Sequence, residues 1–170
     1  VEHIELLTSA SAWIRNFVAG KTLVGGTVHF STGPRSRVIS PAHANIARFQ
    51  RIIDAVGSPE DVSVQRCTPH NLAVQLHYPD DVQLALDCRM DEGLDRHLEM
   101  VLEFEEGIVR QEDGEILLDG SKVELPASEG LFVQDQRSAT AAILDGVESY
   151  TPMEQVLQGL SLADLVMGAA

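Results

Sequence analysis

An alternation of apolar and polar residues between positions 82 and 104 constrains the fold of this chain most strongly. Every second residue of 82–90 is apolar, and residues 98–104 repeat the pattern after a polar turn. Because successive side chains of a strand point to opposite faces of a sheet, this period of two predicts one apolar face and one charged face. Shorter strands are expected at 108–111, 116–118 and 121–125, with Asp119-Gly120 as a hairpin turn. We therefore predict an antiparallel meander from Val82 to Leu125.

Segments on either side of the meander are expected to cover its apolar face with helices. Helical spacing runs from Ile4 to Val18, and a second helix is signalled from Ser40, as its N-cap, to Gly57. Further helices are predicted from Ser128 to Leu144 and from the capping box Thr151-Pro152-Met153-Glu154, which has proline at the first helical position. Further strands are predicted at 23–30, 62–67 and 72–78. The order predicts one α+β domain over residues 1–170: a large, mostly antiparallel open-faced sheet with helices on one face.

Composition excludes several classes of partner. The formal net charge is −14, whereas nucleic acids and anionic membranes bind basic surfaces, so neither is expected as a partner. No apolar run approaches the ~20 residues of a membrane span. Two cysteines, Cys67 and Cys88, are too few for a disulfide framework and favour a reducing, cytoplasmic location. The chain starts at Val1 inside a helical pattern, which is expected of a piece of a longer protein.

The charged face of the predicted sheet has two interpretations. Its members are expected to be Gln75, His77, Gln83, Asp87, Arg89, His97, Glu99 and Glu103. Solvent accounts for such a face, and so does a second copy of the chain docked across a two-fold axis. The sequence alone leaves both open.

Among the six histidines, His43 has the most informative position. With Ser40 as N-cap, it occupies the third helical position, where free backbone N–H groups disfavour the imidazolium ion. A neutral imidazole can polarise a hydroxyl or carbonyl group or exchange a proton with it. The structural alternative is a histidine that packs near the cap. The other histidines match no zinc spacing, and no nucleophile motif or glycine-rich phosphate loop is present.

The helix that follows His43 and the end of the chain together carry a resemblance. The helix 43–57 ends in a glycine and is followed by a strand, and Phe104-Glu105-Glu106-Gly107 forms a Phe-x-x-Gly turn. Residues 132–146 then give a Phe-containing helix that ends in a glycine, and residues 151–163 give a proline-led turn and an amphipathic helix. In this order and spacing the chain resembles the C-terminal domain of the glucose–fructose oxidoreductase / inositol dehydrogenase (Gfo/Idh/MocA) family.

The resemblance implies a substrate-binding and oligomerisation domain of an NAD(P)-dependent oxidoreductase. Its substrate would be sugar-like or another small hydroxyl or carbonyl compound. NAD or NADP would be bound in the full-length protein by an N-terminal Rossmann domain that is absent from this chain, so the isolated chain is expected neither to hold the cofactor nor to turn over. A homo-oligomer, dimer or tetramer, would form through the open sheet face.

The resemblance also implies site residues. His43 corresponds to the family's histidine, which gives or takes a proton at the substrate carbon that bears oxygen. Arg35, Arg37 and Asn45 lie close enough in sequence to contact substrate. Ile39 stands where the family often has an aspartate, and an alignment on Arg48-Phe49 would instead place Ala42 at the histidine position. The alternative is therefore a non-catalytic ligand-sensing or dimerisation module of the same fold.

Overall fold

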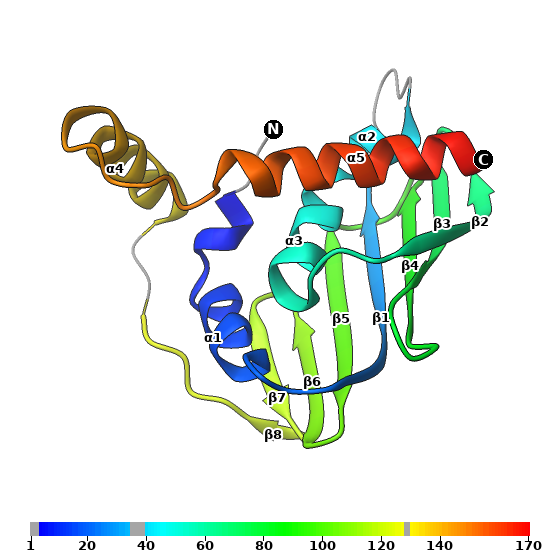
Figure 1. The fold of residues 1–170 in the computed structure, drawn as a ribbon, viewed down its shortest axis with the longest axis horizontal. Coiled ribbons are helices and arrows are strands. Elements are labelled where there is room, and N and C mark those ends of the chain that lie inside the picture. Colours follow the sequence, from blue (N-terminus) through cyan, green and yellow to red (C-terminus); the bar gives the residue numbers. More distant parts are fainter. Residues whose placement is uncertain (1–3, 35–39, 128–129) are drawn as a thin grey trace.

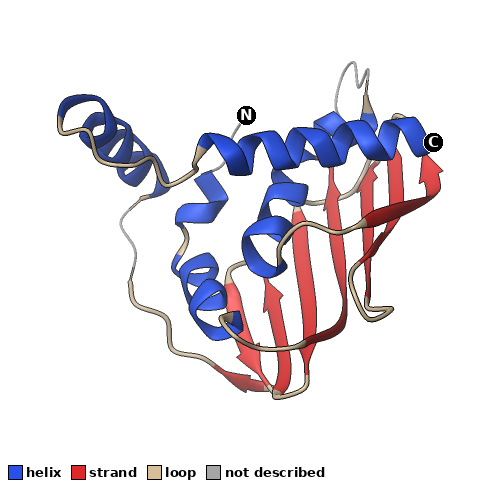
Figure 2. Cartoon of the chain, in the orientation of Figure 1, coloured by secondary structure: helices blue, strands red, loops and turns tan. Residues whose placement is uncertain are grey.

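An eight-stranded mixed sheet is the centre of the fold (Figure 1). A computed structural model describes residues 4–34, 40–127 and 130–170. The strands are β1 Leu23–Thr32, β2 Asp61–Cys67, β3 Asn71–His77, β4 Gln83–Met90, β5 His97–Phe104, β6 Gly107–Glu112, β7 Glu115–Leu118 and β8 Ser121–Lys122. The helices are η1 Ile4–Leu7, α1 Ser9–Val18, α2 Pro41–Ala44, α3 Ile46–Val56, α4 Leu131–Leu144 and α5 Met153–Ala169. The described helices lie on one side of the sheet (Figure 2), so the predicted α+β architecture with an open sheet is confirmed.

The predicted alternation sets which side chains face the helices. In β4, Leu84, Leu86, Cys88 and Met90 are buried, whereas the residues between them are half-buried or exposed. Strands β3 and β5 follow the same pattern, and the ring of Phe104 in β5 meets the ring of Phe17 in α1 edge-on at 6.0 Å. The apolar side of the sheet and the inner faces of the helices thus form one core.

The predicted meander is wrong at one step, because β4 and β5 are not neighbours. Strand β1 lies between them, parallel to β4 and antiparallel to β5, and the sheet order is β2-β3-β4-β1-β5-β6-β7-β8. Gly26 permits this insertion, since a Cβ atom at that position would lie 2.6 Å from the backbone oxygen of Val101. The pairing of β1 with β5 also has a register shift between Leu23 and Gly25. Alternation along a strand specifies faces, and it carries no information about which strand lies alongside.

The helix predicted to run from Pro41 to Val56 is interrupted at Asn45. The Asn45 side-chain amide donates to the Pro41 carbonyl at 3.0 Å, which is the acceptor that the Asn45 backbone N–H would use in a continuous helix. That N–H turns instead to the Ala42 carbonyl, at 3.0 Å. The result is the four-residue α2, followed by α3.

The three other predicted helices also begin differently from the prediction. The first helix is divided into η1 and α1 at Thr8, whose hydroxyl accepts the Ser11 N–H at 3.0 Å as an N-cap. Ser128 lies outside the described residues, and α4 begins at Leu131. The capping box at 151–154 does not form: α5 begins at Met153 with no side-chain cap.

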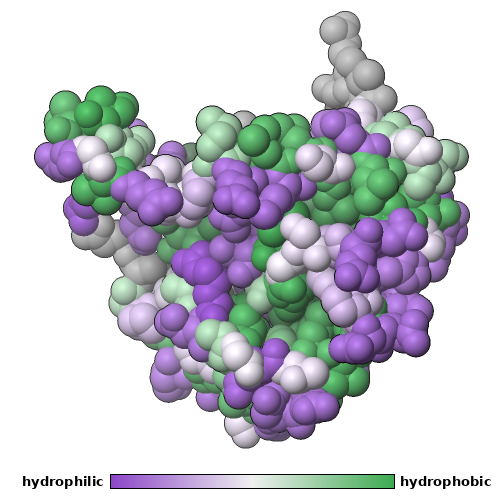
Figure 3. Space-filling view, viewed as in Figure 1, coloured by the Kyte–Doolittle hydropathy of each residue, from purple (hydrophilic) through white to green (hydrophobic). Residues whose placement is uncertain are grey.

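Helices α4 and α5 differ in how they contact the body of the fold. The middle of α5 packs on α3, with Gly159, Leu162 and Ala163 buried. Helix α4 has no buried residue and stands away from the sheet, and Figure 3 shows a hydrophobic surface over it. The large apolar side chains exposed on α4 and just after it are Phe132, Val133, Ile143, Leu144 and Val147. Within the described residues, none of the helices is long and apolar enough to cross a membrane.

Candidate functional site

His43 belongs to α2, and its side chain has a partner at each ring nitrogen, one of them on α5. Its Nδ1 is 2.7 Å from the Ser40 hydroxyl, and its Nε2 is 3.1 Å from Oδ1 of Asp164 in α5. The imidazole is 39% exposed and the carboxylate is 75% exposed, so this chain of three groups lies at the surface. Ser40 makes no hydrogen bond to a helix N–H group, and its hydroxyl meets the imidazole instead.

Buried residues next to these groups hold them in place. Pro41 and Ala42 of α2 are buried, and so are Leu162 and Ala163, which directly precede Asp164. The sequence placed His43 at the start of a long helix, but α2 has only four residues, so the positive potential of a long helix is not available to the ring. Its environment comes from Ser40 and Asp164.

Of the other predicted site residues, only Asn45 lies among the described residues. Arg35 and Arg37, together with Ile39, lie outside the described residues. Asn45 is 2% exposed, and its amide nitrogen is committed to the Pro41 carbonyl. Its amide oxygen is buried without a hydrogen-bond partner among the described residues. Asn45 therefore has a clear structural role at the break between α2 and α3, and its contact with substrate stays a prediction.

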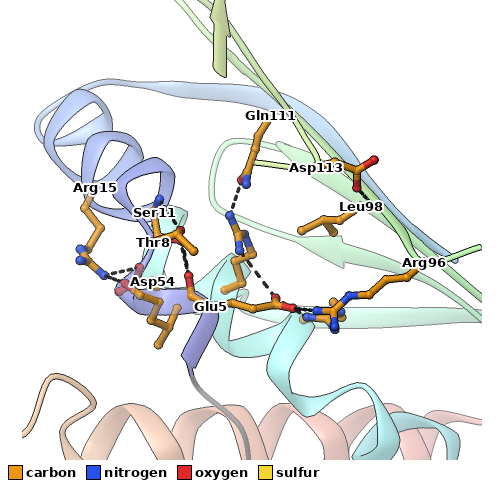
Figure 4. Close-up of polar contacts among 12 residues, drawn as sticks. Glu5, Thr8, Ser11, Arg15, Asp54, Arg96, Leu98, Gln111 and Asp113 are labelled. Atoms are coloured by element: carbon orange, nitrogen blue, oxygen red, sulfur yellow. Dashed lines mark hydrogen bonds and ion pairs between the residues drawn. The ribbon is translucent and has the colours of Figure 1, made fainter. Parts of the chain in front are cut away.

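A second polar cluster, which the sequence patterns did not indicate, is centred on the carboxylate of Glu5 (Figure 4). Arg48 and Arg96 both donate to Glu5, and Nη1 of Arg51 lies 3.6 Å from the same carboxylate. Arg51 also donates to Oε1 of Gln111 on β6. These contacts connect η1, α3, the loop before β5 and the sheet.

The buried arginines of this cluster are electrostatically unusual. Burial lowers the pKa of Arg51 to about 10, partly offset by the attraction of Glu5, so the group stays protonated near neutral pH. The guanidinium of Arg48 lies 4.0 Å from the ring centroid of Phe30, a cation–π contact. Arg48 and Arg51 stand three residues apart on the buried face of α3, a spacing from which a buried charge cluster could have been predicted, although nothing in the sequence connects them with Glu5. Among the described residues, no group of three or more histidine, cysteine, aspartate or glutamate side chains could hold a metal ion.

The open face of the sheet has a small, uncharged centre. Ala85 on β4 pairs with Thr27 on β1, and Thr27 pairs with Val101 on β5, so three compact side chains form a row across the middle strands. All three are half-buried in the single chain. The strand registers place all eight predicted residues of the polar face on this side of the sheet.

Charged side chains surround that centre. Arg89 pairs with Asp87 at 2.8 Å, and Arg110 contacts Glu99 at 2.8 Å. Next to them, Nδ1 of His97 lies 2.7 Å from Asp113. The hydrogen bond to Asp113 raises the pKa of His97. The Asp113 pKa is lowered by the Leu98 N–H that it accepts and by His97.

Solved structures that share this fold include dehydrogenases and a reductase. UDP-N-acetylglucosamine 3-dehydrogenase GnnA from Acidithiobacillus ferrooxidans matches with a TM-score of 0.82 and 14% identity, over 99% of this chain and 60% of its own. Biliverdin reductase from Synechocystis, in complex with biliverdin and NADP+, matches with a TM-score of 0.82 and 20% identity, over 100% of this chain and 62% of its own. The WlbA dehydrogenase from Bordetella pertussis, in complex with NADH and UDP-GlcNAcA, gives a TM-score of 0.75 and 13% identity, over 100% and 60%.

These likenesses confirm the predicted resemblance to Gfo/Idh/MocA-type dehydrogenases at the level of the fold. No protein-family profile and no curated protein sequence matches the chain. The chain spans about three-fifths of the length of the structures that it matches. Because one fold hosts many activities, the likeness establishes the fold and leaves the activity to be argued from the site.

Proposed function

We propose that this chain is the substrate-binding and oligomerisation domain of an NAD(P)-dependent oxidoreductase that acts on a sugar-like or other small hydroxyl or carbonyl substrate. The observation that supports it best is the match of 99% or more of the chain to three-fifths of each of several dehydrogenases and reductases. Those proteins include one solved with NADP+ and one solved with NADH and a nucleotide sugar.

The nicotinamide cofactor would be held outside this chain. A dinucleotide needs a glycine-rich turn after a strand for its pyrophosphate, and the sequence has none. The residues described here therefore do not fit the cofactor, and we assign no contact with it to them. The remaining two-fifths of the matched structures have no counterpart in this chain. Whether NAD or NADP serves the complete protein depends on that part.

His43 is the proposed acid–base group. Oxidation of a hydroxyl group or reduction of a carbonyl group requires a proton acceptor or donor at the oxygen, and a histidine serves this purpose near neutral pH. The half-exposed imidazole at the junction of α2 and α5 is suitable, because burial of its neighbours fixes its position. Arg35, Arg37 and Asn45 stay the predicted substrate contacts.

The open face of the sheet is the proposed interface of a homo-oligomer. Compact, uncharged side chains at its centre allow a second sheet to approach, and the charged side chains at its rim can stay hydrated. Thr27→Arg is expected to separate the copies, because it would place a charge at the centre of the interface. Light scattering measures the change, with Ser161→Arg on the exposed side of α5 as the control. A wild-type chain that is monomeric at high micromolar concentration would contradict a self-sufficient interface.

A non-catalytic ligand-sensing or dimerisation module is the second candidate, and one observation favours it. Both ring nitrogens of His43 already have partners in the described residues, Ser40 and Asp164, so neither is immediately available to a substrate. The coding sequence ahead of Val1 separates the two candidates. A strand followed by G-x-G-x-x-G, with a Glu-Lys-Pro-like motif, would favour the enzyme, and the lack of both would favour the module.

The acid–base role is tested in the longest natural chain that contains these residues. His43→Gln should lower NAD(P)-linked turnover of its sugar-like substrate by about 100-fold, the lower end of what one general acid–base group contributes. His70→Gln is the matched control, because His70 contacts the Met90 carbonyl at 3.1 Å and not the α2–α5 junction. Unchanged turnover in His43→Gln would remove the proposed role.

A further inference from the structure

The two contacts of His43 determine which of its nitrogens carries the proton in the neutral ring. A carboxylate accepts hydrogen bonds and cannot donate them, so Nε2, at 3.1 Å from Asp164, must be the protonated nitrogen. The neutral ring then has a lone pair at Nδ1. Ser40, whose oxygen is 2.7 Å from Nδ1, must therefore donate its hydroxyl hydrogen to the ring.

In this arrangement His43 cannot hydrogen-bond a ligand directly. With Nε2 committed to Asp164 and Nδ1 to Ser40, the ring has no nitrogen left for a third partner. The Ser40 oxygen, in contrast, has spent its hydrogen on the ring and keeps two lone pairs that can accept a hydrogen bond. A ligand hydroxyl that approaches this cluster would find the Ser40 oxygen as an acceptor.

We propose that Ser40 is the catalytic residue that exchanges a proton with a bound hydroxyl or carbonyl compound, with His43 as the base behind it and Asp164 as a positioning residue. This inference rests on the proposed function and adds two residues to it. In the forward direction the ligand O–H bond breaks as its proton passes to Ser40 Oγ. The original Ser40 hydrogen passes at the same time to His43 Nδ1. One proton moves from ligand to imidazole, and no electrons are transferred.

Asp164 acts on the product of that step as well. After the transfer the imidazolium carries hydrogen at both nitrogens, so it donates to Ser40 and to Asp164, and the carboxylate compensates its charge. The backbone of Asp164 is well fixed, because the preceding residue of α5, Ala163, is fully buried in the core. Position 39, where the resemblance expected an acid, holds isoleucine. Asp164 would supply from the last helix the carboxylate that position 39 lacks.

Nuclear magnetic resonance of the 170-residue chain tests the arrangement without any cofactor. The ring nitrogens of neutral His43 should show a protonated Nε2 and an unprotonated Nδ1. Asp164→Ala should release the ring into a mixture of tautomers, and Asp164→Glu should restore the single one. Ser40→Ala should leave Nε2 protonated and shift the Nδ1 resonance. A wild-type ring protonated at Nδ1 would overturn the inference, whatever the activity of the complete protein.

Turnover in the longest natural chain tests the proton step. Ser40→Ala should lower kcat by about 100-fold, and Ser40→Thr, which keeps a hydroxyl, should restore most of it. Ser161→Ala, on the exposed side of α5, should leave turnover unchanged. Full activity of Ser40→Ala beside an inactive His43→Gln would overturn the role of Ser40 and leave the proposed function standing. An active His43→Gln would instead overturn the proposed function, and this inference with it.

Discussion

Two buried glutamines of this fold should respond in opposite ways to the same substitution. Gln50 on α3 is completely buried, and neither atom of its amide group has a hydrogen-bond partner among the described residues. Gln111 on β6 is also buried, but its oxygen accepts a hydrogen bond from the buried Arg51. We expect Gln50→Met to stabilise the chain and Gln111→Met to destabilise it.

The magnitudes follow from these environments. A buried amide without partners costs about 1–3 kcal/mol, and methionine keeps an unbranched side chain of similar length without that cost. The gain should be smaller than the full cost, about 1 kcal/mol, because Gln50 lies tightly against Gly159, where a Cβ atom would be 2.5 Å from its Cγ. Gln111→Met removes one of the acceptors of the buried Arg51 guanidinium, which keeps only the more distant Glu5 carboxylate, and should cost about 2 kcal/mol. The two variants should therefore differ by about 3 kcal/mol.

Equilibrium unfolding in urea measures both variants, and the fluorescence of the single tryptophan, Trp13, reports the transition. Trp13 stacks on Phe17 with ring centroids 5.0 Å apart, far in sequence from both substitutions. The slope of the free energy of unfolding against urea should be equal in all three proteins, so that the midpoint alone records stability. The reasoning is refuted if Gln50→Met loses more than about 1 kcal/mol, or if the two variants shift the midpoint in the same direction.

Three further predictions concern charge and close packing. Glu5→Gln should lower the free energy of unfolding by about 3 kcal/mol in urea titrations, because it removes the carboxylate that the buried arginines contact. The control Glu106→Gln, at an exposed turn, should have no effect, and equal losses in the two variants would contradict the prediction. Gly26→Ala should cost about 1–3 kcal/mol, since its Cβ would meet a backbone oxygen at 2.6 Å, and a stable variant with unchanged midpoint would contradict the close approach. The pKa of His97 is raised in the folded chain, so its contribution to folding stability is complete below the unfolded pKa of 6.5 and is lost as pH rises through the folded pKa. The pKa of Asp113 is lowered, so its contribution to folding stability is present above the unfolded pKa of 3.8 and is lost as pH falls through the folded pKa. The exposed pair of His97 and Asp113 should therefore stabilise the fold slightly at pH values between those two pKa limits. In Asp113→Asn, the thermal unfolding midpoint should no longer change with pH in this way. A pH profile identical to that of the wild type would refute the role of the pair.

Local patterns in the sequence predicted the strands and their faces because they depend on neighbours along the chain. Alternation placed Leu84, Leu86 and Cys88 toward the core, and these residues are buried. The turn Asp119-Gly120 was also predictable, since both residues adopt positive φ, 49° and 79°, which aspartate and glycine tolerate in a tight hairpin.

The helix boundaries were only partly predictable, because side chains compete with the backbone for hydrogen bonds. Asn45 takes the Pro41 carbonyl and divides one expected helix into two. Thr151 carries the sequence signature of a cap, yet its hydroxyl has no hydrogen-bond partner in the described part of the chain. Such competition depends on geometry that a residue pattern does not contain.

The sequence by itself determined the strands, the apolar and polar faces of the sheet and the fold family that the chain resembles, and it located the helices without fixing all of their ends. Tertiary structure alone decided that β1 lies between β4 and β5, that Glu5 meets the arginines of α3, and that Asp164 meets His43. The physical reason is that periodicity and turn chemistry act over a few neighbouring residues. Contacts between segments far apart in the chain depend on how volumes and charges fit once the helices have packed on the sheet.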